Sequence, residues 1–293
     1  MGLLHRPQAG LKRRIAQGVA LSLSLLLLGA CSAETNAQWR NLAMPDPGTK
    51  EAQGIFDLWI WAWVAAMATG VLVWGLIGWV VVRYRRRSED EIPVQTRYNL
   101  PLEIFYTIVP ILMVVVFFFW TVNVQNDVLS EEKQPNHTLV VVGQQWSWTF
   151  NYPGEGVVEA NNVYSSGTGD QIPTLYLPVG ETTRFELRSP DVIHSFWIPG
   201  FLMKMDIIPG RANHFQVTPR EEGEYLGKCA ELCGTYHSRM LFNVKVVSRA
   251  EYDAHLRDLE AEGNTSDAPI IGGKYADTMV GMETNTTDEG GAE

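Results

Sequence analysis

Two cysteines, a histidine and a methionine occur within twelve residues in the last third of the sequence. Cys229, Cys233, His237 and Met240 follow one another at spacings of four, four and three residues. Thiolate, thioether and imidazole donors together favour copper over magnesium, calcium or manganese, and such mixtures suit rapid electron transfer. Any one of these residues alone would be read as an ordinary buried side chain. Their joint spacing instead predicts a copper site.

A more distant histidine, His194, completes this set of donors. It lies in a segment that reads as the end of a strand, and in a β-sandwich such an end can share a rim with the cysteine loop. A mononuclear electron-transfer site uses two histidines, one cysteine and a weak methionine ligand. The second cysteine allows both sulfurs to bridge two copper ions, with one histidine on each. Sharing an unpaired electron between two metals lessens the structural change on reduction, so we expect a binuclear centre.

The residues that must position these ligands have the pattern of short strands. Beyond Asn123 the sequence is rich in Val, Phe, Thr and Trp and is interrupted by glycine-containing turns, which is typical of a β-sandwich or barrel. A helix is expected only at 249–262, which argues against a parallel α/β fold. The predicted strands are 139–142, 146–150, 182–187, 214–217 and 241–247.

Two apolar stretches precede this domain, and each is long enough to cross a bilayer. Both contain a long run without charged residues, and a membrane span needs about 20 apolar residues. We therefore predict transmembrane helices at 55–82 and 103–124. Five arginines lie in the loop 83–102, which places this loop in the cytoplasm. The domain that follows, at 125–262, is then on the extracytoplasmic side.

The N-terminal residues read as an export signal. A basic Lys-Arg-Arg sequence precedes an apolar run that ends at Leu-Gly-Ala and Cys31. We predict a lipoprotein-type signal peptide at 1–30 and acylation of Cys31, which would add membrane affinity. An extracytoplasmic segment at 31–54 would follow. Ordinary cleavage that leaves Cys31 without a role is the alternative.

The charge of the chain excludes one class of partner. The 293 residues carry a net charge of −10, and the mean hydropathy is −0.06. From Asn123 onward, 12 basic residues stand against 25 acidic ones, so this part lacks the positive surface that binding a nucleic acid needs.

Residues 263–293 are acidic and rich in Gly and Thr, and we expect them to form a flexible tail. Three cysteines make no disulfide framework.

The combination resembles subunit II of the haem-copper cytochrome c oxidases, in the form found in actinobacteria. The resemblance spans 55–247. It rests on the hairpin, the Gln-Trp-Ser-Trp sequence at 145–148, the segment around His194, the Ile-Pro-Gly-Arg sequence at 208–211 and the cysteine loop. It implies a membrane-anchored α+β fold, in which a two-helix transmembrane hairpin is followed by a cupredoxin-like β-sandwich or barrel.

The resemblance also implies a ligand set for a binuclear copper A centre. The carboxylate of Glu231 would turn towards subunit I and help to hold a magnesium ion, a cation that prefers oxygen. From the residues alone, Glu231 would be read as a solvated loop acid. The copper ligands would be the side chains of His194, Cys229, Cys233, His237 and Met240 and the backbone carbonyl of Glu231.

Other positions of the family carry over with a structural alternative beside them. Trp146 matches the aromatic residue through which electrons arrive from haem c, but it could equally be a half-buried strand residue. Glu103 matches the carboxylate at the entrance of a proton pathway on the cytoplasmic side. An acid at the start of a helix is also favoured by the helix dipole. Asp206 and Arg211 match a loop that faces subunit I.

Two departures from the family concern the electron donor. Relatives served by a soluble, basic cytochrome c present carboxylates where this chain has Asn151 and Pro190. Electrostatic steering sets how fast such partners meet. We therefore expect a membrane-bound dihaem cytochrome c of a bc-type complex, held in a supercomplex, rather than a freely diffusing donor.

These observations lead to one function and two alternatives. We expect the electron-accepting subunit of a respiratory oxidase in the bacterial plasma membrane, working with subunits I and III. Haem a and copper B, where oxygen is reduced to water and protons are translocated, would lie in subunit I. A membrane-tethered copper chaperone also uses two cysteines separated by three residues. A quinol oxidase subunit II shares the fold but lacks the copper ligands.

Overall fold

A computed structural model of the chain describes residues 17–18, 39–131, 134–168 and 171–272. Met1–Pro45 and Asp46–Glu293 form two compact units. Of the first unit only 17–18 and 39–45 are described, with helical residues at 39–40 followed by a turn. The predicted acylation site, Cys31, and nearly all of the predicted signal peptide lie outside the described residues.

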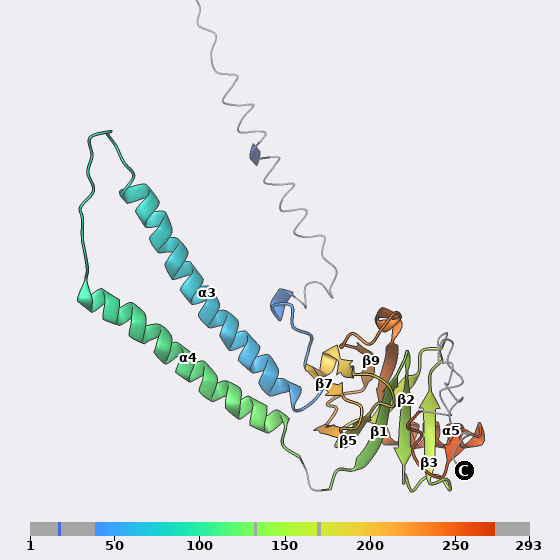
Figure 1. The fold of residues 1–293 in the computed structure, drawn as a ribbon. Coiled ribbons are helices and arrows are strands. Elements are labelled where there is room, and N and C mark those ends of the chain that lie inside the picture. Colours follow the sequence, from blue (N-terminus) through green and yellow to red (C-terminus); the bar gives the residue numbers. More distant parts are fainter. Residues whose placement is uncertain (1–16, 19–38, 132–133, 169–170, 273–293) are drawn as a thin grey trace, which may run out of the picture. The chain divides into compact units, whose positions relative to one another are not determined.

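Two long helices open the second unit, as the apolar stretches predict (Figure 1). Helix α3 covers Ala52–Arg83 and α4 covers Leu100–Val128. Both are long and apolar enough to cross a membrane. Asn99 caps α4 by accepting a hydrogen bond from the Leu102 amide, and such caps satisfy amides that have no partner within the helix. Each helix begins three residues before its predicted start. Helix α3 ends one residue and α4 ends four residues after the predicted end.

The remainder of the described chain forms a sandwich of two β-sheets. One sheet has the strand order β11-β3-β2-β1-β5-β8 and the other has the order β4-β10-β9-β6-β7. Strands β1 and β5 pair in parallel, as do β10 and β4, while the other pairs are antiparallel. The first sheet consists of β11 (Thr265–Ser266), β3 (Asn162–Ser166), β2 (Ser147–Pro153), β1 (His137–Gln144), β5 (Thr183–Arg188) and β8 (Asn213–Val217). The second consists of β4 (Thr174–Pro178), β10 (Leu241–Val247), β9 (Gly223–Cys229), β6 (His194–Ile198) and β7 (Met203–Ile207).

This arrangement confirms the predicted fold class, a two-helix hairpin followed by a cupredoxin-like sandwich. Each predicted strand overlaps an observed one, and the predicted C-terminal helix is α5, Arg249–Ala261. Every second side chain of β5 faces the core, so buried and partly exposed residues alternate along it. This alternation in the sequence is what predicts a strand. Strands β3, β4, β7, β9 and β11 were not predicted, since they are short or carry mixed polar and apolar residues, and β6 was expected only as a strand end at His194.

Aromatic rings fill the space between the two sheets. Phe196 of β6 stacks on Phe242 of β10 with ring centroids 4.9 Å apart. Trp148 of β2 meets both rings edge-on, at 5.7 Å and 5.1 Å. Burial of such large side chains dominates the energy of a core. The strands that border the candidate site are therefore held by the core beneath them.

The segment predicted as a flexible tail is attached to the sandwich over its first part. Thr265 and Ser266 form β11 and pair with β3. Ile270 is buried, and its amide donates to Oδ1 of Asn151. The prediction was wrong for residues 264–272, because backbone pairing, the amide side chain of Asn151 and burial of Ile270 bind this segment to the sandwich. Residues 273–293 lie outside the described part of the chain.

Candidate metal centre

The candidate ligands come from the ends of two neighbouring strands. Strand β6 begins at His194, and β9 ends at Cys229. Phe196 pairs with Cys229 across these strands, and the Ala230 amide donates to the Ser195 carbonyl at 3.0 Å. The structure thereby brings His194 beside the loop that carries the two cysteines.

Hydrogen bonds from the backbone and from two side chains fix the ends and the middle of this loop. The amide of Cys229 donates to the carbonyl of Met240 at 3.0 Å. The indole of Trp148 donates to the same carbonyl at 3.3 Å. Gln145 reaches the middle of the loop, where its side-chain amide donates to the Cys233 carbonyl at 2.7 Å. A short 3-10 helix, His237–Arg239, then orients the last two donors.

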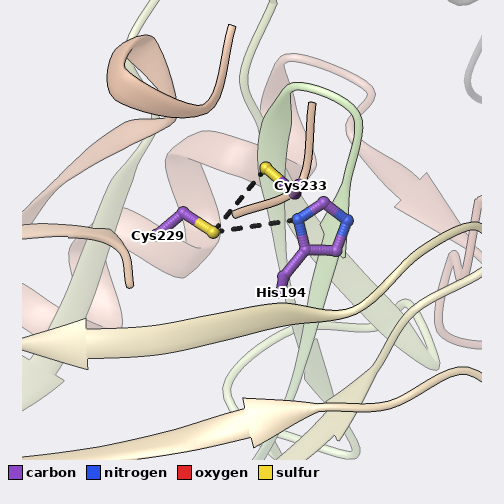
Figure 2. Close-up of side chains that lie close together, drawn as sticks. All are labelled: His194, Cys229 and Cys233. Carbon is purple, nitrogen blue, oxygen red and sulfur yellow. Dashed lines mark hydrogen bonds between the residues drawn. The ribbon is translucent and has the colours of Figure 1, made fainter. Parts of the chain in front are cut away.

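All six expected donor groups converge on one place. Figure 2 shows His194, Cys229 and Cys233 facing one another, and their donor atoms lie within 4.8 Å of one another. Cys229 Sγ is 3.8 Å from Cys233 Sγ and 3.9 Å from His194 Nδ1. The remaining distances are 3.6 Å from Cys233 Sγ to His237 Nδ1, 3.8 Å from Cys233 Sγ to Met240 Sδ, and 3.2 Å from Cys229 Sγ to the Glu231 carbonyl oxygen.

The donors fit a binuclear copper centre better than a single hard cation. Both cysteines are free and buried, and His194 and Met240 are fully buried. The two sulfurs lie side by side, and each has an imidazole next to it. No side-chain carboxylate oxygen belongs to this group of donors among the described residues. Soft donors without carboxylate favour copper.

Ionisation of one of the two thiols opposes ionisation of the other. Burial opposes ionisation of Cys229, but hydrogen bonds from His194 and from backbone amides outweigh it and lower the pKa of this thiol to about 6. Burial and the neighbouring charge of Cys229 raise the pKa of Cys233 to about 12. Without a metal, one thiol of the pair therefore ionises readily. Ionisation of the second thiol requires a positive charge nearby. A metal supplies that charge.

Asp191 links the donor group to the hairpin between β1 and β2. Its Oδ1 accepts a hydrogen bond from His194 Nε2 at 2.9 Å, and its Oδ2 accepts one from the Gln145 amide at 2.7 Å. Burial raises the pKa of Asp191, but these bonds and one from the Val192 amide outweigh it, so the pKa lies below its usual range. Sequence reasoning missed this role, although an aspartate three residues before a metal-binding histidine is a signal for it.

Trp146 lies at the turn of the same hairpin, next to the metal loop. It is half-buried, and its ring meets the ring of Tyr236 edge-on at 5.0 Å. The indole nitrogen has no hydrogen-bond partner among the described residues. The indole of Trp146 therefore lies against Gly234 and Tyr236 of the loop that carries the cysteines.

Exposed apolar residues surround the donor group. We call Val192, Ile193, Leu232 and Tyr236 the apolar rim. Each directly precedes a donor residue or lies within two residues of one, and they are 36%, 45%, 78% and 44% exposed. Glu231 and Arg239 beside the same donors are also exposed. Exposed apolar residues next to a candidate site favour an interaction surface there.

Glu103, Asp206 and Arg211 are not part of the donor group, and Glu231 takes part in it only through its carbonyl. The side chain of Glu103 accepts a hydrogen bond from the Asn99 amide at the start of α4. Arg211 is exposed and Asp206 is partly exposed, with the Lys204 ammonium 3.4 Å from Asp206 Oδ1. Glu231 contributes its carbonyl to the donor group, while the residue itself is exposed.

Asn151 and Pro190, the two departures from the family that concern the electron donor, lie in different environments. Asn151 is fully buried, and its side chain bonds the backbone of Val140 and of Ile270. A residue there cannot face a partner in this chain, so its lack of charge says nothing about the donor. Pro190 is exposed and lies against Gly272.

Comparisons with known proteins point to one family. Residues 137–247 match the family described as cytochrome C oxidase subunit II, periplasmic domain, and residues 37–124 match its transmembrane domain. The chain is 47% identical to the probable cytochrome c oxidase subunit 2 of Streptomyces coelicolor, over 90% of this chain and 92% of the relative. It is 33% identical to cytochrome c oxidase subunit 2 of Corynebacterium glutamicum, over 89% of each.

Among solved structures, the chain is similar to the periplasmic domain of subunit II of cytochrome oxidase from Bradyrhizobium japonicum. The identity is 29% and the TM-score is 0.39, over 44% of this chain and 96% of that domain.

Proposed function

The chain belongs to the cytochrome c oxidase subunit II family, and from that membership we propose that it is the electron-accepting subunit of its oxidase. Electrons would arrive one at a time from haem c and pass on to haem a of subunit I, where oxygen is reduced to water at the haem and copper B site. The convergence of two thiols, two imidazoles, a thioether and a carbonyl carries this proposal. A binuclear copper A centre held there would supply the redox chemistry.

The chain's own residues would hold this centre and lead electrons to it. The centre would be held by the side chains of Cys229, Cys233, His194, His237 and Met240 and by the carbonyl of Glu231. Asp191 fixes the ring of His194 so that Nδ1 faces the sulfurs. The loop bonds hold the cysteine loop in place without a metal, which would keep the reorganisation on reduction small. Trp146 would be the surface group nearest the donor haem.

A test of the copper proposal uses the domain from Asn123 onward, loaded with copper. We expect a purple protein with a seven-line paramagnetic spectrum, because one unpaired electron is shared by two copper ions. A blue protein with four lines would mean a single copper. A colourless protein would favour the copper chaperone or the quinol oxidase subunit, the two alternatives from other functional classes.

The apolar rim supports a donor held permanently nearby. Apolar contact surfaces suit long-lived complexes, whereas brief encounters depend more on charge. The donor would be a dihaem cytochrome c anchored in the membrane as part of a bc-type complex. Membranes that retain this complex should pass electrons to the oxidase much faster than purified oxidase accepts them from soluble cytochrome c. Equal rates would contradict an anchored donor.

Two carboxylates would serve ions at the boundary with subunit I. Glu231 is exposed beside the donor group, so its carboxylate is free to help hold a magnesium ion together with subunit I. Glu103 would line a proton entrance, although its cap on α4 is a sufficient structural reason for an acid there. The substitution Glu103→Gln preserves an acceptor for the Asn99 amide. Unchanged proton uptake in that variant would leave only the capping role.

The membrane arrangement follows from the helices and the arginine-rich loop. The chain is a membrane protein with a periplasmic domain. We propose that it lies in the bacterial plasma membrane, with residues 83–102 in the cytoplasm and the sandwich outside. Cys31 would be the acylated N-terminus of the mature protein. Mass spectrometry of the mature chain would detect a diacylated or triacylated cysteine, and an unmodified N-terminus at another residue would contradict this.

A further inference from the structure

The segment directly in front of α3 is bonded to the sandwich. We call residues 48–51 the clamp. Its first two residues, Gly48 and Thr49, are buried, and Thr49 forms an antiparallel bridge with Pro219. Three backbone hydrogen bonds join the clamp to the sandwich, from the Gly48 amide to the Gly200 carbonyl at 2.8 Å, from the Lys50 amide to the Thr218 carbonyl at 2.9 Å and from the Arg220 amide to the Gly48 carbonyl at 3.0 Å. The clamp is therefore part of the fold of the domain.

Glu51 adds two hydrogen bonds through its carboxylate. Its Oε2 accepts from the Thr218 amide at 2.9 Å, and its Oε1 accepts from the Thr218 hydroxyl at 3.1 Å. Hydrogen bonds to an ionised carboxylate are among the stronger ones. Glu51 directly precedes α3, but its side chain makes no capping bond to that helix, and the Ala52 amide donates to Thr49 Oγ1 instead. Capping therefore does not explain the acid at this position, whereas the contact with Thr218 does.

Thr218 also connects the clamp to the segment that follows α4. Its hydroxyl oxygen lies 3.1 Å from the hydroxyl oxygen of Thr182, which is buried. The Thr182 amide donates to Oδ1 of Asn136, the residue directly before β1, at 2.8 Å. One polar network thus joins the start of α3 to the chain that leaves α4.

The two strands that carry metal ligands meet the clamp at their other ends. Strand β6 begins at His194, and Gly200, two residues beyond its end, accepts the bond from Gly48. Strand β9 ends at Cys229, and close to its start the ring of Tyr225 packs on Gly48, where a Cβ would come within 2.9 Å of Tyr225 Cε1. Close-packed, paired strands deform little and transmit displacements. A shift at the clamp should therefore move the candidate ligands with it.

We infer that Glu51 is a positioning residue, which holds the clamp on the sandwich through Thr218 and so keeps the metal centre at a constant distance from the haem that accepts its electrons. This inference rests on the proposed function, because it needs that acceptor in subunit I. A displacement of about 1 Å between reacting groups can slow a reaction about 100-fold. Without the two bonds of Glu51, the sandwich can shift relative to the start of α3, and the distance to the acceptor then varies.

The test uses intact oxidase that carries Glu51→Ala, which removes both bonds to Thr218. A photoexcited ruthenium complex reduces the copper centre in a flash, and the absorbance of haem a then follows the transfer out of that centre. We expect this transfer to slow about three- to tenfold, because the distance is no longer constant. Glu51→Gln keeps one acceptor for Thr218 and should give an intermediate rate. Reduction of the copper centre by haem c, measured separately by stopped flow, should keep its wild-type rate, since the apolar rim is unaltered.

The matched control is Glu260→Ala. Glu260 of α5 also accepts two hydrogen bonds, but they come from the amides of Glu159 and Ala160 and do not involve the clamp. The copper spectrum should be that of wild type in every variant, which separates positioning from damage to the site. A wild-type transfer rate in the Glu51→Ala oxidase, equal slowing in the control, or slowing that accompanies an altered copper spectrum would overturn the inference.

Amide hydrogen exchange examines the clamp without any electron transfer. In the Glu51→Ala oxidase the amides of Lys50 and Thr218 should exchange at least about tenfold faster, whereas the core amide of Phe196 should keep its protection. Unchanged exchange at Lys50 and Thr218 would overturn the holding role of Glu51. Thr218→Val removes only the hydroxyl and decides the question if the Glu51 variant does not assemble, because transfer to haem a should then slow about twofold and a wild-type rate would overturn the inference. A wild-type oxidase without a copper spectrum would instead overturn the proposed function, whatever the exchange at the clamp.

Discussion

Asp191 holds the imidazole of His194 from the side opposite to the sulfurs. The 2.9 Å bond from His194 Nε2 to Asp191 Oδ1 leaves Nδ1 facing Cys229 Sγ at 3.9 Å. The same carboxylate binds the Gln145 amide, directly before Trp146. One side chain therefore fixes a candidate ligand and the turn through which electrons would arrive.

Replacing Asp191 by Asn should weaken copper binding about 10- to 100-fold, which is the range for the loss of a partner behind a metal-bound histidine. The amide can still fill the space but carries no charge to balance the bound cation. Competition with a chelator, followed through the copper spectrum of the loaded domain, measures the affinity. Asp206→Asn is the control, since Asp206 is partly exposed and belongs to β7. Equal affinities in the wild type and the Asp191 variant would contradict this role.

Trp146→Leu should leave the copper spectrum unchanged while slowing reduction of the centre by haem c at least about tenfold, equivalent to about 1.4 kcal/mol in the barrier. The indole is adjacent to the metal loop but is not among its donors. Stopped-flow reduction of intact oxidase gives the rate. Trp197→Leu is the matched control, because Trp197 is a partly exposed tryptophan that packs on Lys228 at 4.5 Å. A similar slowing in both variants would show that Trp146 has no special part.

The stability of the domain should depend on pH through His137. Its ring nitrogens lie 2.8 Å from Glu155 Oε1 and Glu181 Oε2. Burial lowers the pKa of His137, but the bonds and charges of these two glutamates outweigh it and raise the pKa above its ordinary value of 6.5. A group whose pKa is higher in the folded state stabilises fully below the unfolded pKa, and this contribution is lost as pH rises through the folded pKa.

The substitution His137→Gln should therefore cost most at acidic pH. Urea unfolding of the domain gives the free energy at several pH values between about 5 and 9. The difference between wild type and variant should be about 3 kcal/mol where His137 is charged, because the buried carboxylate of Glu155 and the partly buried carboxylate of Glu181 each lose a charged partner. It should shrink as pH rises above 6.5. A difference that is constant across this range would show that His137 stays neutral in the fold.

Gly227→Ala should destabilise the domain by about 1–3 kcal/mol, the usual cost of overpacking a core. A Cβ at Gly227 would overlap the ring of Phe242, which is stacked on Phe196 in the core. Gly227 lies two residues before Cys229, so the copper content should fall as well. Gly156→Ala is the control, because nothing lies near that Cβ. A loss below about 0.5 kcal/mol in chemical unfolding would mean that Phe242 can move aside.

The sequence was most informative where chemistry restricts the residue types. The spacing from Cys229 to Met240 indicated which side chains share a loop, and the charge-free stretches indicated the two helices. The hydrogen bond between Asp191 and His194 could not be predicted in the same way. An aspartate near a histidine is common, and only the turn at 189–193 brings the carboxylate to Nε2.

Segment 264–272 shows a different limit of sequence reasoning. It belongs to an acidic stretch rich in Gly and Thr, whose composition favours a flexible tail. What binds it is backbone pairing with β3 and one amide side chain at Asn151, 119 residues earlier in the chain. The hydrogen bond to Ile270 also explains why residue 151 is an asparagine, where comparison with the family suggested only the loss of a carboxylate. Such long-range polar contacts leave no periodic signal in a sequence.

The most direct test of the central claim follows electrons through the intact oxidase after rapid mixing with reduced haem c. The copper absorption should bleach first, and haem a should become reduced only afterwards. In the Cys233→Ser variant, which keeps one thiolate and cannot form the paired bridge, haem a should stay oxidised over the same interval. Reduction of haem a at the wild-type rate in that variant would contradict the account.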